Sequence, residues 1–219
     1  MGQISENVKA LLSCIPEGVL LVAATKGRTT EEIREAISAG IKIIGENYLQ
    51  ETERKFREIG RVVQWHYIGS VQRRKIKKLV DIFDMIETID SFSNAEELDK
   101  ICNLLNIKKP VLVEVNSGRE PNKSGVMPED VVSFIRVISG FEHISVQGLM
   151  TMGPLLYDPE KYRPYFSLTR ELFEEINERN FQNVEMKYLS MGMSASFKVA
   201  IDEGANIVRI GTLIFGPRE

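Results

Sequence analysis

The sequence has few of the residues from which disulfide frameworks and metal sites are built. It contains two cysteines and two histidines among 219 residues. Two thiols in a chain of this length, Cys14 and Cys102, argue against a disulfide framework and for a reducing compartment. Both lie in apolar stretches, so we predict that both are small core residues. The cysteines and histidines are too far apart for a metal-ligand pattern, and we expect no metal site.

Long apolar runs and an excess of one charge are also missing. No apolar run approaches the roughly 20 residues of a membrane span, and the N-terminus lacks the charged-then-apolar order of a signal peptide. The net charge of −3 gives no reason to expect a nucleic acid or an acidic membrane as a partner. These absences predict a soluble, cytoplasmic protein.

Eight short apolar runs alternate with amphipathic stretches along the whole chain. Most are apolar over their full length, as expected for strands that are covered on both faces. The predicted strands are Val19–Ala24, Ile41–Gly45, Val63–Ile68, Asp84–Ile89, Pro110–Val115, Ile144–Met150, Met186–Leu189 and Asn206–Ile210.

The stretches between these strands carry helix signals. Thr29 and Glu32 fit a capping box, and Ser93 and Glu96 repeat the pattern. Ala195–Glu203 is predicted as the helix before the last strand. A leading helix is expected ahead of the first strand, with its apolar face on Ile4, Val8, Leu11 and Leu12.

Eight strand–helix units in one chain predict the α/β class and a parallel sheet, which closes naturally into a (β/α)8 TIM barrel. An open doubly wound sheet is the alternative, but no Gly-x-Gly-x-x-Gly follows the first strand. We see no linker or second domain, and the chain stops a few residues after the last strand. We therefore expect a single domain.

Two segments follow the seventh and eighth strands, where such barrels often hold a phosphate. They are Ser190-Met191-Gly192-Met193-Ser194 and Arg209-Ile210-Gly211-Thr212. Glycine lets the backbone approach a ligand, and hydroxyls with free N–H groups favour an anion. Either segment alone could be a capped helix or a turn. Together, at the two expected loops, they predict a phosphate site.

Lys26 comes directly after the first apolar strand. Burial disfavours the charged form of a lysine and so frees an amine that can attack a carbonyl. Taken alone, a lysine whose ammonium reaches solvent past the strand end is the commoner arrangement. Its place beside two phosphate loops in a closed ring makes Lys26 a candidate nucleophile.

Other polar residues at the strand ends have structural interpretations as well. Asn47 either hydrogen-bonds near a bound ring or caps the next helix, and His66, between aromatics, is predicted to be a satisfied core histidine. The basic run 73–78 includes the apolar Ile76, which favours a solvated helix surface over a nucleic-acid site. Lys123 could contact an anion, although turn chemistry alone explains its segment.

Several segments, in order over nearly the whole chain, resemble the pyridoxal phosphate homeostasis protein family, known as YggS in bacteria and PROSC in animals. They are Ala23-Ala24-Thr25-Lys26, Gly45-Glu46-Asn47-Tyr48-Leu49-Gln50-Glu51, Trp65-His66-Tyr67-Ile68-Gly69, Lys123-Ser124-Gly125, Gly148-Leu149-Met150, Leu189-Ser190-Met191-Gly192-Met193-Ser194 and the run from Val208 to Gly216. One departure is Gly69-Ser70-Val71-Gln72, where the family usually has Gly-Pro/His-Leu-Gln.

The resemblance implies an alanine-racemase-like barrel over residues 1–219, of fold type III without the C-terminal β domain. It also implies a cofactor, the vitamin B6 derivative pyridoxal 5′-phosphate (PLP), whose aldehyde Lys26 holds as a Schiff base. The remaining roles that it implies are phosphate binding by Ser190, Ser194, Gly211 and Thr212, a place for Asn47 near the ring, and contact of Arg209 with the pyridine nitrogen.

A guanidinium stays protonated, so beside Arg209 the ring nitrogen should act as an acceptor and remain unprotonated. An unprotonated pyridine is a poorer electron sink for carbanion chemistry. The resemblance therefore favours a PLP carrier or buffer, without substantial catalysis and without catalytic residues, in intracellular PLP homeostasis. Its expected partners are PLP and apo forms of PLP-dependent enzymes, and its expected state is a monomer or weak dimer.

The alternative function is a PLP-dependent amino-acid racemase. Two-base racemisation needs a second acid–base group, which a tyrosine of a C-terminal β domain supplies in the related alanine racemases. We expect that domain to be absent here. Tyr48 and Tyr67 could be proposed as substitutes, but only their location argues for them.

Overall fold

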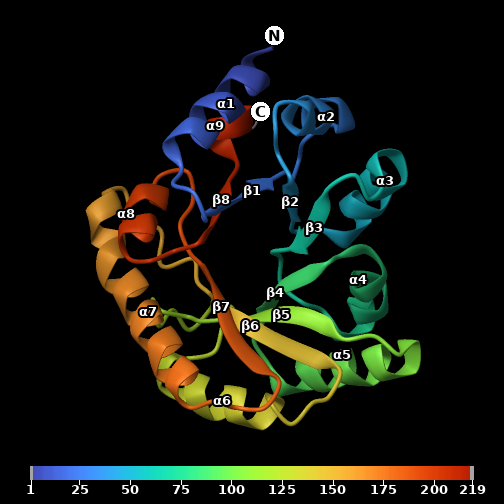
Figure 1. Ribbon diagram of the computed structural model, residues 1–219, viewed down its shortest axis with the longest axis vertical. Coiled ribbons are helices and arrows are strands. Elements are labelled where there is room, and N and C mark those ends of the chain that lie inside the picture. The colour runs from blue at the N-terminus through green and yellow to red at the C-terminus, as the bar shows by residue number, and fades with distance from the viewer. Residues whose placement is uncertain (1, 218–219) are drawn as a thin grey trace.

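The computed structural model describes residues 2–217. Eight parallel strands follow one another in chain order around a closed barrel, and the last pairs with the first (Figure 1). They are β1 Leu20–Ala24, β2 Ile43–Glu46, β3 Gln64–Tyr67, β4 Met85–Ile89, β5 Lys109–Glu114, β6 Ile144–Met150, β7 Val184–Ser190 and β8 Ile207–Ile210. The predicted strands and the (β/α)8 barrel are confirmed, and the open sheet is excluded.

The helices form a ring outside the strands (Figure 1). Within residues 2–217 they are α1 Gln3–Cys14, α2 Thr30–Ser38, α3 Leu49–Ile59, α4 Ile76–Ile82, α5 Phe92–Leu105, α6 Val131–Ile138, α7 Arg163–Glu178, α8 Phe197–Asp202 and α9 Thr212–Phe215, with 3-10 turns η1 Arg73–Lys75, η2 Pro128–Asp130 and η3 Pro159–Tyr162. None of these helices has the length and apolar character to cross a membrane.

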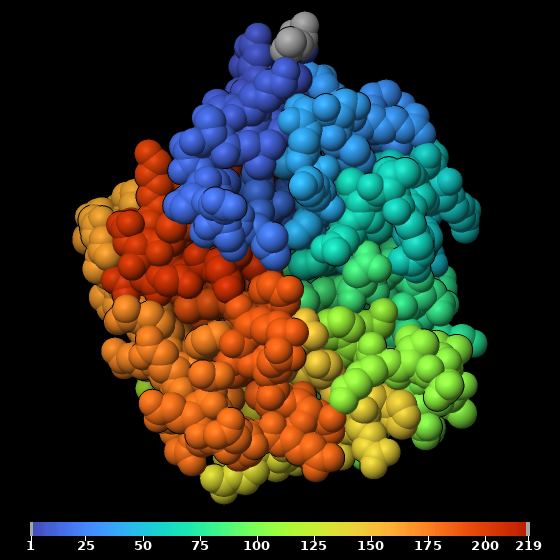
Figure 2. Space-filling model, in the orientation of Figure 1, coloured from blue at the N-terminus to red at the C-terminus, as the bar shows by residue number. Residues whose placement is uncertain are grey.

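The first and last helices, α1 and α9, lie together. Asn7 in α1 donates a hydrogen bond from Nδ2 to the carbonyl of Ile214 in α9, at 3.0 Å. Figure 2 shows the N-terminal residues in blue directly against the C-terminal ones in red. The ring of strands is therefore closed by contacts between the first and last helices as well as by the β1–β8 pairing.

The predicted leading helix is present, but part of its core face is wrong. Val8 and Leu11 are buried, whereas Leu12 is 40% exposed and Cys14 is exposed. Each step of three residues falls about 60° short of a full helical turn, so Cys14 has rotated away from the side of Val8. Cys102 is buried, as predicted.

Helix starts were predicted less well than strands. Thr29 and Glu32 form the expected capping box, but Ser93 does not cap α5. That helix begins at Phe92, after Ser91, and in its first turn the side-chain amide of Asn94 donates to the carbonyl of Val71. Helix α8 likewise begins at Phe197, after the predicted Ala195.

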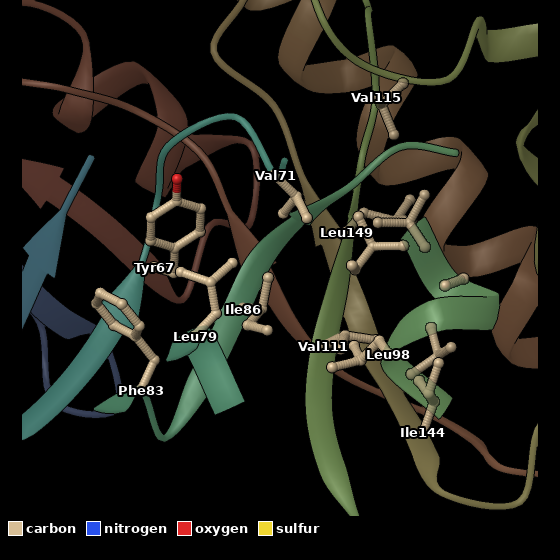
Figure 3. Packing of buried hydrophobic residues seen from close by; sticks show 14 of the residues in the cluster. Tyr67, Val71, Leu79, Phe83, Ile86, Leu98, Val111, Val115, Ile144 and Leu149 are labelled. Carbon is tan, nitrogen blue, oxygen red and sulfur yellow. The ribbon is translucent and has the colours of Figure 1, made fainter. Parts of the chain in front are cut away.

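The larger apolar core lies between the strands and the helices. Figure 3 shows the rings of Tyr67 and Phe83 side by side, with centroids 5.0 Å apart, and Leu79 near Ile86. The helix α4 begins inside the basic run, and its residues Ile76 and Leu79 are buried. The run therefore has a buried inner face. The predicted solvated helix surface is confirmed, since the other side of the run, including Lys77 and Lys78, is exposed.

A second core fills the inside of the barrel and is built from Val22, Ile43, Met85, Leu112, Met150 and Ile207. Side chains two residues apart on a strand point the same way. Three polar residues lie two positions further along these strands, and all are buried. They are Glu87 after Met85, Glu114 after Leu112 and Arg209 after Ile207. The barrel interior therefore changes from apolar to polar toward the C-terminal ends of the strands.

Glu114 is the carboxyl of this polar layer that titrates near neutral pH. Burial, together with the charge of nearby Asp90, raises the pKa of Glu114 to about 7, although Arg209 acts in the opposite direction. Burial also raises the pKa of Asp90. The charge of the polar layer thus depends on pH.

Replacing Glu114 should change how stability depends on pH. Its carboxyl keeps a proton in the folded state up to about pH 7, whereas in the unfolded chain it loses the proton near its ordinary 4.5. Folding stability should therefore fall as pH rises through this window, by on the order of 3 kcal/mol. Glu114→Gln cannot ionise and should lack this loss.

Urea unfolding of both proteins at pH 5 and pH 8 measures the difference. Glu129→Gln is the matched control because Glu129 lies at the surface, where it pairs with Arg119. An equal decline with pH in the wild type and Glu114→Gln would contradict the assignment.

Candidate functional site

A cavity of about 260 Å³ opens at the C-terminal ends of the strands. Six of the seven residues predicted from the sequence line it, namely Lys26, Asn47, Ser194, Arg209, Gly211 and Thr212. They come from segments that follow or end β1, β2, β7 and β8. The seventh, Ser190, lies outside the lining.

The charge of the cavity lining is of one sign. Lys26, Arg28 and Arg209 are in the lining, and no carboxylate is among the described residues that form it. This is notable in a chain whose net charge is −3. With the hydroxyls of Ser194 and Thr212, the lining has the donors that an anionic group prefers.

One wall of the cavity is largely apolar and comes from the segment between β6 and α7. Met152, Leu155, Leu156 and Tyr162 line it. The Tyr162 hydroxyl accepts a hydrogen bond from the Leu156 N–H at 3.0 Å. The lining therefore offers contacts both for an anionic group and for an apolar body. The sequence carried no signal for this wall, because its leucines stand in an irregular loop.

Lys26 is half-buried at the corner of a tight turn. The Arg28 N–H donates to the Thr25 carbonyl at 3.0 Å and closes the turn. Gly27, the third residue of the turn, has φ +73°. Type II turns require this left-handed backbone at that position, and glycine adopts it without strain. The turn therefore sets the point from which the Lys26 side chain leaves the barrel rim.

Arg209 is only 4% exposed. Its Nη2 donates to the carbonyl of Thr151 at 2.8 Å, and its Nη1 donates to the Ser190 hydroxyl. Burial lowers the pKa of Arg209, and the carboxylates of Glu87 and Glu114 act against that change. Since a guanidinium holds its proton in proteins, Arg209 presents a fixed positive charge to the cavity.

Ser190 is fully buried and outside the cavity lining, and its hydroxyl forms hydrogen bonds within the protein. It donates to Oε2 of Glu87 at 2.6 Å and accepts from Arg209. The other oxygen of Glu87 contacts Nδ1 of His66 at 2.7 Å. His66 is therefore a satisfied core histidine, as predicted. The sequence analysis expected Ser190 among the phosphate ligands, whereas the structure places it outside the cavity lining.

Glu87 is a member of this network that the sequence analysis missed. Burial alone would raise its pKa, but hydrogen bonds and charge from His66, together with Arg209 and Ser190, outweigh it and lower the pKa. Glu87 is thus an ionised counterpart to Arg209, 3.9 Å from Nη1. The sequence feature that could have identified Glu87 is a single carboxylate inside the otherwise largely apolar strand Met85–Ile89.

Asn47 faces the cavity and does not cap a helix. Its Nδ2 donates to the carbonyl of Ile68 at 3.1 Å, and α3 begins after Tyr48 without a side-chain cap. Its Oδ1 is buried and has no hydrogen-bond partner among the described residues. Gly69 makes this possible, because a Cβ there would overlap the Asn47 carbonyl. A buried acceptor without a partner at a cavity wall suits a ligand that donates.

The remaining candidates lie outside the cavity lining. Lys123 forms an ion pair with Glu120 at 2.6 Å. The Tyr67 hydroxyl donates to the Ser70 carbonyl, and Tyr48 is exposed. In the described residues no group of three or more histidines, cysteines or carboxylates could hold a metal ion.

Comparison with known proteins agrees with the motifs. The sequence model of the alanine racemase N-terminal domain family matches residues 1–219. A pyridoxal phosphate homeostasis protein of Aquifex aeolicus is 42% identical over 200 residues, which cover 91% of this chain and 87% of the relative. One from Schizosaccharomyces pombe is 36% identical over 203 residues, covering 91% and 84%.

Solved structures agree as well. PipY of Synechococcus elongatus with PLP bound has a TM-score of 0.90 and 32% identity, covering 98% of this chain and all of PipY. Alanine racemase of Clostridium difficile shares the fold alone, with a TM-score of 0.80 and 17% identity over 98% of this chain and 56% of the racemase. The chain therefore belongs to the alanine racemase N-terminal domain family and, within it, to the pyridoxal phosphate homeostasis proteins.

Proposed function

We propose that residues 1–219 act as a single barrel domain that binds PLP at the cavity and serves PLP homeostasis as a carrier or buffer. The observation that carries the proposal is the cavity lining, with three cations and no carboxylate among its described residues. The names of the relatives and the PLP-bound PipY structure support it. Apo forms of PLP-dependent enzymes are candidate recipients, and the protein acts as a monomer or weak dimer.

The residues present fit the cofactor part by part. The hydroxyls of Ser194 and Thr212, with the backbone at Gly211, suit a phosphate, and Arg209 suits a ring nitrogen that accepts. The buried Oδ1 of Asn47 can take a hydrogen bond from the ligand. Ser190 serves the site through Arg209, to which its hydroxyl is bound.

Lys26 is the residue that would hold the cofactor covalently. When bound, the cofactor supplies an aldehyde, which a neutral amine converts reversibly to a Schiff base with release of one water. The turn at Gly27 places Lys26 on the cavity rim, in the same lining as the proposed phosphate ligands. Water can reverse the link, which suits a carrier.

Two features of the lining support the carrier over a racemase. The guanidinium of Arg209, held by Thr151, Ser190 and Glu87, is too basic to lose its proton, so it can donate a hydrogen bond to a ring nitrogen but does not protonate it. A second acid–base group is also needed for racemisation. Tyr162 is the tyrosine of the described lining, and its hydroxyl is bound to the Leu156 backbone.

Lys26→Ala should remove the adduct that borohydride traps on PLP-loaded protein, because Lys26 is the one lysine among the described residues of the cavity lining. Peptide mapping of the reduced protein checks the site. Lys123→Ala is the matched control and should label normally, since Lys123 lies outside the cavity lining. A label that maps to another lysine in the wild type would sink the assignment.

The wild-type protein should not interconvert L- and D-alanine at ordinary enzymatic rates, which are about 1 s⁻¹ or more. Chiral chromatography of alanine incubated with PLP-loaded protein measures this, beside an authentic alanine racemase. Turnover at such rates in the wild type, lost in Lys26→Ala, would contradict the carrier function and support the racemase function.

A further inference from the structure

The turn that carries Lys26 contacts an ion cluster around the buried Lys55 and Glu46, with Glu51 at its partly exposed edge, which the sequence analysis did not consider. Lys55 in α3 is fully buried. Its Nζ lies 2.6 Å from the Thr25 carbonyl, 2.6 Å from Oε1 of Glu46 and 2.6 Å from Oε1 of Glu51. Lys55 thus donates hydrogen bonds to Thr25 and Glu46 and forms an ion pair with Glu51. We refer to Glu46, Glu51 and Lys55 as the clamp.

The clamp reaches the peptide groups on both sides of Lys26. On one side, Thr25 accepts from Lys55 with its carbonyl and donates its hydroxyl to Glu46 Oε1 at 2.6 Å. On the other side, the Gly27 N–H donates to Glu51 Oε1 at 2.7 Å. Since Glu51 also binds Lys55, one connected cluster fixes both neighbours of Lys26.

General stability is a poor explanation for such a cluster. Removing an ammonium and carboxylates from water opposes much of their mutual attraction, and apolar residues of similar size often stabilise a core as well or better. Elsewhere, α3 packs on the barrel through apolar residues such as Leu49 and Ile59. Unlike apolar contacts, hydrogen bonds between charged groups are directional, so they can fix the orientation of the backbone that they bind.

We propose that Lys55 and Glu51 are positioning residues, which hold the turn so that the amine of Lys26 is aimed into the cavity for reaction with an aldehyde. This inference rests on the proposed function. It adds that the covalent link needs the clamp, whereas the anion contacts do not. Ser194, Arg209 and Thr212 lie on or after β7 and β8, and the clamp lies between β1, β2 and α3.

The test compares two ligands. PLP can bind both covalently and through its phosphate and ring, whereas pyridoxine 5′-phosphate has an alcohol in place of the aldehyde and uses only the second set of contacts. The ratio of their dissociation constants therefore reports the Lys26 link. Titration calorimetry or tryptophan fluorescence measures both constants.

Glu51→Ala removes the acceptor of the Gly27 N–H and leaves Lys55 paired with Glu46. PLP should bind about tenfold more weakly, as expected for loss of a hydrogen bond to a charged group. Pyridoxine 5′-phosphate should bind within twofold of the wild type. Glu51→Gln, whose amide oxygen can still accept, should restore most of the ratio. Glu53→Ala is the matched control, because Glu53 lies in the same helix but pairs with Lys78 at the surface.

Equal weakening of both ligands in Glu51→Ala would show a general loosening and overturn the positioning role. An unchanged ratio would overturn it too. Lys55→Met leaves the buried Glu46 carboxylate without its cation and can unfold the chain, so the melting temperature of every variant is measured and Glu51 carries the test. If the wild type prefers PLP no more than the alcohol, the Schiff base itself is wrong, and the inference falls with it.

Discussion

The buried positive charge of Arg209 determines the polar layer at the C-terminal ends of the strands. The guanidinium of Arg209, 4% exposed, is surrounded by a carbonyl from the end of β6, a hydroxyl from β7 and a carboxylate from β4. A charge can stay in such a place only if its hydrogen bonds are satisfied. The polar layer is therefore best understood as the set of partners that Arg209 requires, including His66, which acts on Arg209 through Glu87.

The site joins two parts of the chain that meet only when the barrel closes. Lys26 and its clamp belong to β1, β2 and α3, whereas the proposed anion ligands follow β7 and β8. The β1–β8 pairing brings the parts together, and Arg28 donates a hydrogen bond to the Gly216 carbonyl across the same seam.

The sequence predicted what depends on local pattern and missed what depends on distant contacts. Eight apolar runs sufficed for the strands, and strand order sufficed to bring six candidate residues to one cavity. The occupation of the Ser190 hydroxyl by Glu87 could not be predicted, because the two residues are 103 positions apart. The role of Lys55 could not be predicted either, because in the sequence it is one of several charged residues on a polar helix.

The apolar wall bears on how tightly the cavity is closed. Leu155 lines the cavity, yet it is 85% exposed, and Tyr157 beside it is fully exposed. A racemase gains from excluding water around its reacting groups, because water competes for protons and weakens electrostatic contacts. A carrier gains from the opposite, since water must reach the Schiff base to release the cofactor. The exposed wall and the fixed charge of Arg209 therefore fit the proposed carrier better than a racemase.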